Sequence, residues 1–388
     1  MNRSGFILAI IVVAQFCCTS LWFAGNGVMA DLINSYGLRE GALGSLTSAV
    51  QLGFITGTFL FAALTIADRF SPSRVFLCCA LAGAALNLGM TAEGNTLGSL
   101  LLVRFGTGFF LAGIYPVGMK IASDHFKEGL GKSLGFLVGA LVVGTALPHL
   151  LKNSAGAMHW KSVIQLVSAI ATVGGLLMVT FVPDGPYRKA GVAADFSAFF
   201  RVFRKKELRS SAFGYFGHMW ELYTFWAFVP VMLSAYLKAH PPATLNIPLW
   251  SFLIIATGGG ACVAGGFLSQ RFGVKRTATT ALFLSCTCCL LAPFLFQVEQ
   301  QSFFLAFLLF WGMVVIADSP LFSTLVAQSA DPEIKGTALT IVNGIGFSIT
   351  IISIQLLAAV TSFTDAKGVY ALLAIGPILG LLSLRRSG

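Results

Sequence analysis

Long runs of apolar residues, separated by short polar or charged breaks, make up most of this chain. Each run has about 20 residues, the length that an α-helix needs to cross about 30 Å of hydrocarbon. Only helices fit, because backbone groups in lipid must be satisfied internally and these runs are twice the length of a barrel strand. The breaks predict twelve spans, which start near Phe6, Leu43, Arg74, Leu97, Gly131, Trp160, Ala212, Leu249, Arg276, Ser302, Lys335 and Gly368.

Composition excludes the soluble alternatives. Of 388 residues, 56% are hydrophobic and 10% are charged, whereas about 25% are charged in an average soluble domain. Twelve spans leave no room for a separate soluble domain. The eight cysteines lie within apolar runs, with no metal-ligand spacing that includes His. We therefore expect an all-α membrane protein with no metal, no cofactor and no enzymatic activity.

The distribution of Lys and Arg predicts the orientation. Nineteen of them fall in breaks on the side of Arg3, five fall on the opposite side, and Arg104 lies within a span. Positive charge collects on the cytoplasmic side, so both termini are expected in the cytoplasm of a multi-pass cell-membrane protein. The same bias accounts for the net charge of +10 without a nucleic-acid partner.

The two halves of the chain have Arg, Pro and Gly residues at corresponding positions, about 200 residues apart. The matched positions are Arg69 with Arg271, Pro116 with Pro320, and Gly139 with Gly344. A duplicated six-helix unit is expected, with two pseudo-symmetric bundles. The predicted domains are an N-terminal bundle at 1–182, a basic cytoplasmic linker at 183–211 and a C-terminal bundle at 212–388.

With these features the sequence resembles the major facilitator superfamily of secondary transporters. The resemblance rests on the loop at 266–276, its first-half copy at 68–74, the segment 104–108 and the glycine-rich segment 135–144. The copies depart from the family's loop signature at Leu64, which replaces Gly, and at Gln270, which replaces Asp. Ala140 stands where the family's antiporter motif has Pro, which weakens an antiporter assignment. The resemblance implies the family's fold and alternating access.

Ionisable side chains inside spans are the main candidates for function, because a charge at mid-bilayer costs at least about 2.5–3.5 kcal/mol. Glu221 and Asp318 are the two acidic residues within spans, and Arg104 is the basic one. His218 precedes Glu221 by three residues, so both project from one helix face and could share a proton. We expect proton coupling at Glu221, His218 and Asp318, against the alternative of structural ties between helices.

Span one carries a polar stripe. Gln15, Thr19, Trp22 and Asn26 recur at helical spacing on one face. In the family that the chain resembles, spans one, four, seven and ten line the central cavity. The candidates for substrate binding are Arg104, Trp22, Asn26, Gln15, Tyr115 and Trp220. Two alternatives stay open: the tryptophans could serve packing, and Arg104 could clamp helices or reach the outer surface.

The sequence thus predicts a proton-coupled symporter that moves a small polar or anionic organic solute by alternating access between two halves. The resemblance implies a cytoplasmic gate at Asp68, Arg69 and Arg271. Efflux of amphipathic, drug-like compounds is the first alternative, and a passive channel or receptor-like scaffold is the second. The expected partners are a small-molecule substrate, protons or another coupling ion, and the lipid bilayer, and the expected state is a monomer.

Overall fold

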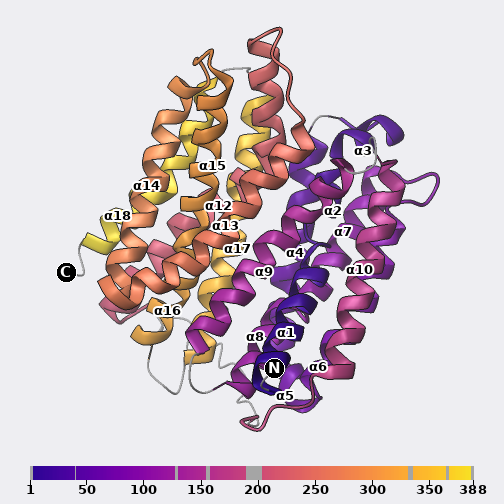
Figure 1. The fold of residues 1–388 in the computed structure, drawn as a ribbon, viewed down its shortest axis with the longest axis vertical. Coiled ribbons are helices and arrows are strands. Elements are labelled where there is room, and N and C mark those ends of the chain that lie inside the picture. The colour runs from indigo at the N-terminus through magenta and orange to yellow at the C-terminus, as the bar shows by residue number, and fades with distance from the viewer. Residues whose placement is uncertain are drawn as a thin grey trace. The chain divides into compact units, whose positions relative to one another are not determined.

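The computed structural model describes residues 3–39, 41–126, 130–153, 158–188, 203–330, 335–363 and 367–385, and every regular element in these ranges is a helix. The chain divides into two compact units, Met1–Ala193 and Ala194–Gly388. The helices of unit 1 are α1 (Arg3–Thr19), α2 (Ala24–Gly27), α3 (Met29–Tyr36), α4 (Ala42–Ala63), α5 (Ile66–Arg69), α6 (Pro72–Gly89), α7 (Leu97–Leu111), α8 (Tyr115–His125), α9 (Leu130–Asn153) and α10 (Trp160–Phe181) (Figure 1). Those of unit 2 are α12 (Lys206–Ala239), α13 (Ile247–Phe272), α14 (Val274–Leu295), α15 (Gln301–Ala317), α16 (Ser319–Ser329), α17 (Lys335–Phe363), η3 (Lys367–Ala374) and α18 (Ile375–Arg385).

The prediction of an all-helical chain with many membrane spans is confirmed. Among the described residues, eleven helical segments are long and apolar enough to cross a membrane, and Ser4–Thr19 adds a shorter apolar helix. The observed helices begin within six residues of the predicted starts. The largest difference is at α12, which begins at Lys206, so the last residues of the predicted linker 183–211 are helical. Residues 189–202 of that linker lie outside the described residues.

Three predicted spans are interrupted. The first is divided among α1, α2 and α3, the fourth between α7 and α8, and the tenth between α15 and α16. The breaks in the fourth and tenth spans come just before Pro116 and Pro320, each in the first turn of the following helix. Proline is favoured in that turn and lacks the N–H that would continue the preceding helix. Apolar patterning could not locate these breaks, because hydrophobicity continues through them.

The internal repeat extends to individual backbone contacts. The fourth and tenth spans, Leu97–His125 and Gln301–Ser329, have the same length of 29 residues. A Cβ added at Gly108 would lie 2.0 Å from the Val50 carbonyl oxygen, and one added at Gly312 would lie 2.0 Å from that of Ile254. Both residues of the second pair follow their counterparts by 204 positions. The same close helix crossing is therefore built twice.

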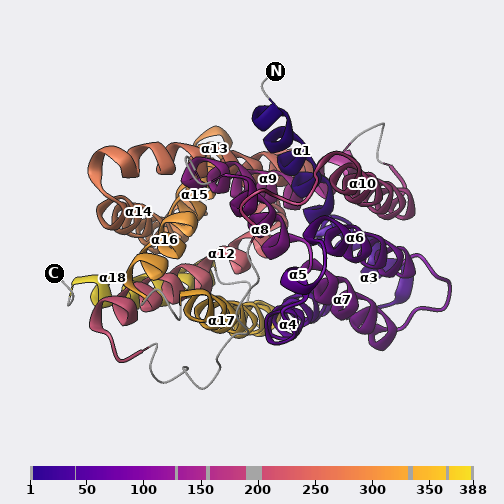
Figure 2. The same cartoon turned by 90° about the horizontal axis from the view of Figure 1, so that it is seen from below.

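Corresponding helices pack alike within each unit. In unit 1, α4 packs on α7, and α1 packs on α9 and α10. In unit 2, α13 packs on α15, and α12 packs on α17 and α18. Figure 2 shows these helices end-on. In both units the first span therefore lies against the fifth and sixth, and the second lies against the fourth.

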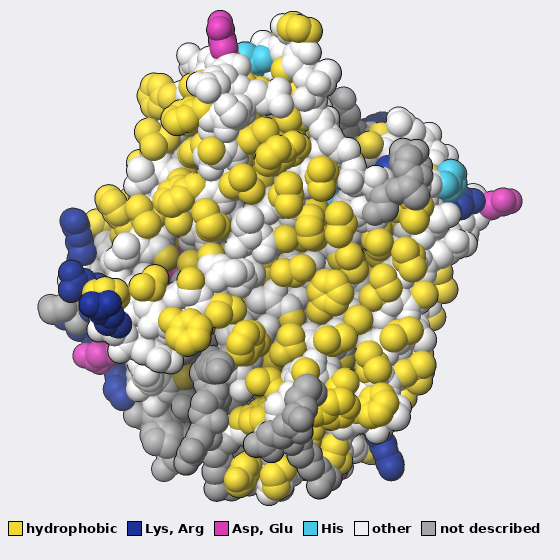
Figure 3. Space-filling view, viewed as in Figure 1, with side chains coloured by type: hydrophobic (Ala, Val, Ile, Leu, Met, Phe, Trp, Pro, Cys, Tyr) yellow, Lys and Arg dark blue, Asp and Glu magenta, His cyan; other side chains and the backbone are white. Residues whose placement is uncertain are grey.

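The outward surface of these helices is apolar. Leu102, Phe283, Phe294 and Ile352 are each more than half exposed. Hydrophobic side chains cover most of the face in Figure 3, and the visible charged side chains lie near helix ends. A solvated surface would not retain so much exposed hydrocarbon, whereas lipid has no such penalty. The chain is a multi-pass membrane protein.

Candidate functional site

In unit 1 the candidate site is centred on the interruption between α1 and α2. The Thr19 hydroxyl donates to the Gln15 carbonyl oxygen at 2.8 Å, and the Ser20 hydroxyl donates to that of Cys17 at 2.6 Å. Such side-chain bonds compete with the backbone ladder and loosen the end of a helix. The main-chain carbonyls of Leu21 and Trp22 are then available to a side-chain donor.

Arg104 of α7 supplies that donor. Its Nη1 donates to the Leu21 carbonyl oxygen at 3.1 Å, and its Nη2 donates to that of Trp22. The side chain is 1% exposed. The guanidinium lies beside Gly25, where an added Cβ would be 3.4 Å from Nε. Arg104 thus ties α7 to the interrupted first span, and its Nε has no hydrogen-bond partner among the described residues.

Two other candidates from the first span, Trp22 and Asn26, contact α4. Asn26 Nδ2 donates to the Thr47 hydroxyl at 2.9 Å, and the ring of Trp22 packs against Phe54 with centroids 4.7 Å apart. Gln51, one turn from Thr47, is fully buried and its amide has no hydrogen-bond partner among the described residues. We did not select Gln51 from the sequence. Its four-residue spacing from Thr47 on a span was the available signal.

Gln15 and Tyr115 lie toward α8. Gln15 is fully buried against Gly118, where an added Cβ would lie 2.1 Å from Oε1. Its amide has no hydrogen-bond partner in the described part of the chain. Tyr115 is partly buried at the start of α8. On α9, His149 is also buried, and within the described ranges its Nε2 has no partner. Unit 1 therefore contains several buried polar groups that are available to a ligand.

In unit 2, His218 of α12 pairs with Asp318, which lies between α15 and α16. Nδ1 of His218 is 2.8 Å from Oδ1 of Asp318, and both side chains are 1% exposed. No hydrogen-bond partner for His218 Nε2 occurs among the described residues. The sequence associates His218 with Glu221 through their shared helix face, and the structure adds Asp318 as a contact of His218. Helical spacing could not indicate this contact, because Asp318 belongs to another span.

Glu221 points to α14 and α15 instead. One carboxylate oxygen accepts from Trp311 Nε1 at 2.6 Å, and the other accepts from the Ser285 hydroxyl. The side chain is completely buried. Neither Trp311 nor Ser285 was chosen from the sequence, because contacts between distant spans leave no local pattern. The two donors hold the carboxylate in one orientation.

Trp220 is separated from this group. Its Nε1 donates to the Leu372 carbonyl oxygen of η3 at 3.1 Å, and its Cβ lies 2.4 Å from the position that a Cβ at Gly376 would take. The side chain is partly buried. These contacts tie Trp220 to η3 and α18, and its role in substrate binding stays a prediction.

Asp68 of α5 forms an ion pair within unit 1. Its Oδ1 lies 3.0 Å from Nζ of Lys120, which also lies 3.3 Å from Oδ2 of Asp124. Arg188 binds Asp184 and donates to the Asp68 carbonyl oxygen at 3.0 Å. Lys120 is not among the gate residues that the sequence predicts. Its four-residue spacing from Asp124 on a helix was the signal for an ion pair.

The other two gate candidates, Arg69 and Arg271, are exposed. The Arg271 guanidinium carbon lies 5.4 Å from the ring centroid of Phe272. No group of three or more metal-ligating side chains occurs in the described ranges.

The family is shown by comparison with known proteins. Residues 11–354 match the model of the Major Facilitator Superfamily. The chain belongs to this superfamily. Membership makes it a membrane transport protein and not an enzyme. Its fold is similar to those of nucleoside transporter NupG (15% identity, TM-score 0.74, 99% of both chains) and the human organic anion transporter MFSD10 (15%, 0.76, 99% of this chain and 100% of the other).

A more local sequence similarity connects the chain to NiaP of Bacillus subtilis (strain 168), which is described as a niacin/nicotinamide transporter. The two are 27% identical over 169 residues, which is 41% of this chain and 39% of NiaP. The matched region thus spans less than half of that relative.

Proposed function

We propose that this superfamily member is a secondary active transporter that moves a small polar or anionic organic solute across the cell membrane by alternating access, driven by protons. The observation that carries the proposal is the buried contact between His218 and Asp318 at the break before Pro320. Burying two titratable groups within membrane spans is costly, so their presence favours a functional role. In this reading both termini lie in the cytoplasm.

Proton coupling needs a site whose charge changes during the cycle. The imidazole and the carboxylate attract each other when His218 is protonated and Asp318 is ionised, and a second proton on Asp318 removes that attraction. Asp318 lies where α15 gives way to α16, so its charge acts on the connection between two helical segments. Glu221, three residues after His218 on α12, supplies a second buried carboxylate in the same unit.

Substrate contacts in unit 1 are assigned to Gln15, Trp22, Asn26 and Tyr115. The buried amide of Gln15 has no partner in the described part of the chain, which supports a hydrogen-bonding role toward a polar solute. Arg104 holds the interrupted first span, and direct recognition of an anionic group through Nε is the second role to test. Trp220 is retained as a candidate with packing as its alternative.

The cytoplasmic gate is assigned to Asp68, Arg69 and Arg271, with Lys120 as the residue that fixes Asp68. An ion pair that is partly exposed contributes little free energy, so it can form and break during a transport cycle. This property suits a gate better than a permanent tie.

The first solutes to test are nicotinate, nicotinamide and a nucleoside, on the strength of the names of NiaP and NupG. Purified protein in proteoliposomes should accumulate a transported solute above its external concentration only when a proton gradient is imposed. Equilibration without accumulation would identify a passive channel. Accumulation of amphipathic drugs in inverted vesicles, without uptake of these solutes, would favour efflux.

A further inference from the structure

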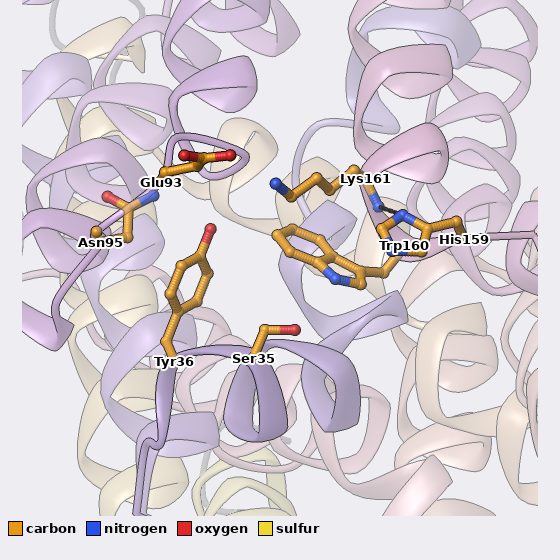
Figure 4. Close-up of a pocket in the computed structure, with 8 residues that line it drawn as sticks. Ser35, Tyr36, Glu93, Asn95, His159, Trp160 and Lys161 are labelled. Atoms are coloured by element: carbon orange, nitrogen blue, oxygen red, sulfur yellow. Dashed lines mark hydrogen bonds between the residues drawn. The ribbon is translucent and has the colours of Figure 1, made fainter.

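A second binding site is suggested by a cavity at the end of unit 1 opposite α5. The cavity has a volume of about 640 Å³ and lies between the end of α3, the loop after α6 and the start of α10 (Figure 4). Its walls include Tyr36, Glu93, Asn95, His159, Trp160 and Lys161. The volume is in the range of small-molecule sites, which is about 300–1,000 Å³.

The walls of this cavity are fixed by internal hydrogen bonds. The Tyr36 hydroxyl lies 2.9 Å from the carbonyl oxygens of Met90 and Ala92, and Asn95 Nδ2 donates to the Gly89 carbonyl oxygen at 2.9 Å. The rings of Tyr36 and Trp160 meet edge to face with centroids 5.8 Å apart. These contacts connect α3, α10 and the loop after α6, so the cavity is preformed.

Opposite charges face one another across the opening. Glu93 and Lys161 project from the two sides in Figure 4, and neither has an ion-pair partner among the described residues. Lys161 Nζ lies 5.8 Å from the centroid of the Trp160 ring. His159 stacks on the same indole with centroids 6.0 Å apart. The cavity therefore combines one anionic group, one cationic group and an aromatic wall.

We propose that this cavity binds a small zwitterion with an aromatic side chain, of the chemical class of a free aromatic α-amino acid. Glu93 binds the ammonium group, Lys161 binds the carboxylate, and the aromatic wall contacts the ring. All of these residues belong to unit 1, and none is assigned to transport or proton coupling above. The site is thus independent of the proposed transport function.

The experiment measures binding of three probes to the full-length protein in lipid nanodiscs by titration calorimetry. L-Phenylalanine carries both charges, phenethylamine carries only the ammonium, and 3-phenylpropionate carries only the carboxylate. L-Phenylalanine should bind severalfold more tightly than either analogue, because a contact with a partly exposed charge is worth up to about a factor of five.

Two variants then separate the two charges. Glu93→Gln should weaken binding of L-phenylalanine and phenethylamine up to about fivefold and leave binding of 3-phenylpropionate unchanged. Lys161→Gln should weaken L-phenylalanine and 3-phenylpropionate and leave phenethylamine unchanged, while Lys161→Arg keeps binding. Glu299→Gln, at an exposed residue in unit 2, is the matched control and should alter nothing.

The proposal is overturned if the three probes bind equally, if none binds, or if both variants weaken all probes to the same extent. It is also overturned if Asp318→Asn abolishes binding of L-phenylalanine, because the probe would then depend on the transport site. Retained binding in that variant supports a separate site, whether or not transport is proton-driven.

Discussion

Nδ1 of His218 lies 2.8 Å from Oδ1 of Asp318, and this contact joins α12 to the break between α15 and α16. Both groups are buried in a unit whose helices are otherwise apolar along most of their length. The contact therefore places two titratable side chains at a point where the tenth span is interrupted.

Removing either titratable group should uncouple transport from the gradient. Asp318→Asn and His218→Gln are expected to lower gradient-driven accumulation at least about tenfold and to keep solute exchange without a gradient. The double variant should be no worse than either single one, because both act in one step. The control is His240→Gln, at the residue that follows the end of α12. Full gradient dependence in Asp318→Asn would contradict the coupling role.

Substitutions of Glu221 should separate its structural and coupling roles. Glu221→Leu leaves Trp311 Nε1 and the Ser285 hydroxyl buried without an acceptor, which costs about 1–3 kcal/mol for each group. Glu221→Gln keeps an acceptor oxygen and should fold with a smaller fall in melting temperature. We expect Glu221→Gln to weaken the gradient dependence of uptake in proteoliposomes. An unchanged dependence would restrict coupling to His218 and Asp318.

Substitution of Arg104 should lower stability more than it changes substrate recognition. Arg104→Ala leaves the carbonyls of Leu21 and Trp22 without their donor, at a cost on the order of 3 kcal/mol. Thermal unfolding in detergent should show a lower melting temperature, with exposed Arg39→Ala as the control. A normal melting temperature together with a raised KM for an anionic solute would instead identify Arg104 as a substrate residue.

The repeated glycine crossings should respond alike. Gly108→Ala and Gly312→Ala each place a Cβ against a backbone oxygen that cannot move alone. Both should lower the free energy of unfolding by about 1–3 kcal/mol, the usual cost of overpacking. Gly98→Ala on the same α7 meets nothing closer than 3.8 Å and should be neutral or stabilising. Unfolding monitored by tryptophan fluorescence compares the three, and equal effects of all three would rule out the close-crossing explanation.

The ion pair between Asp68 and Lys120 should matter more for transport than for stability. Both side chains are 23% exposed, and pairs of this kind contribute about 0–1 kcal/mol. Asp68→Asn and Lys120→Met should change the melting temperature little and lower the transport rate severalfold. The double variant should resemble the single ones. A normal rate in both single variants would remove the pair from the gate.

The fold was largely predictable because its strongest constraint is local. Lipid requires long apolar runs, and these runs mark the helices directly, as at Leu97 and Trp160, where the predicted and observed starts coincide. Contacts between spans were harder to predict from the sequence. His218 and Glu221 share a face, yet their partners come from residues about 100 and 90 positions away, Asp318 and Trp311. Helical spacing contains no information about such distances.

The interruption after Thr19 has a consequence for the order in which unit 1 can be assembled. At 1.5 Å per residue, the 17 residues of α1 extend about 25 Å, less than the hydrocarbon thickness. The donor for the Leu21 and Trp22 carbonyls is synthesised some 80 residues later, on α7. The end of α1 therefore reaches its final hydrogen-bonding state only after α7 has been synthesised and has entered the bilayer. Folding of unit 1 in the membrane is therefore complete only once Arg104 has been inserted with α7.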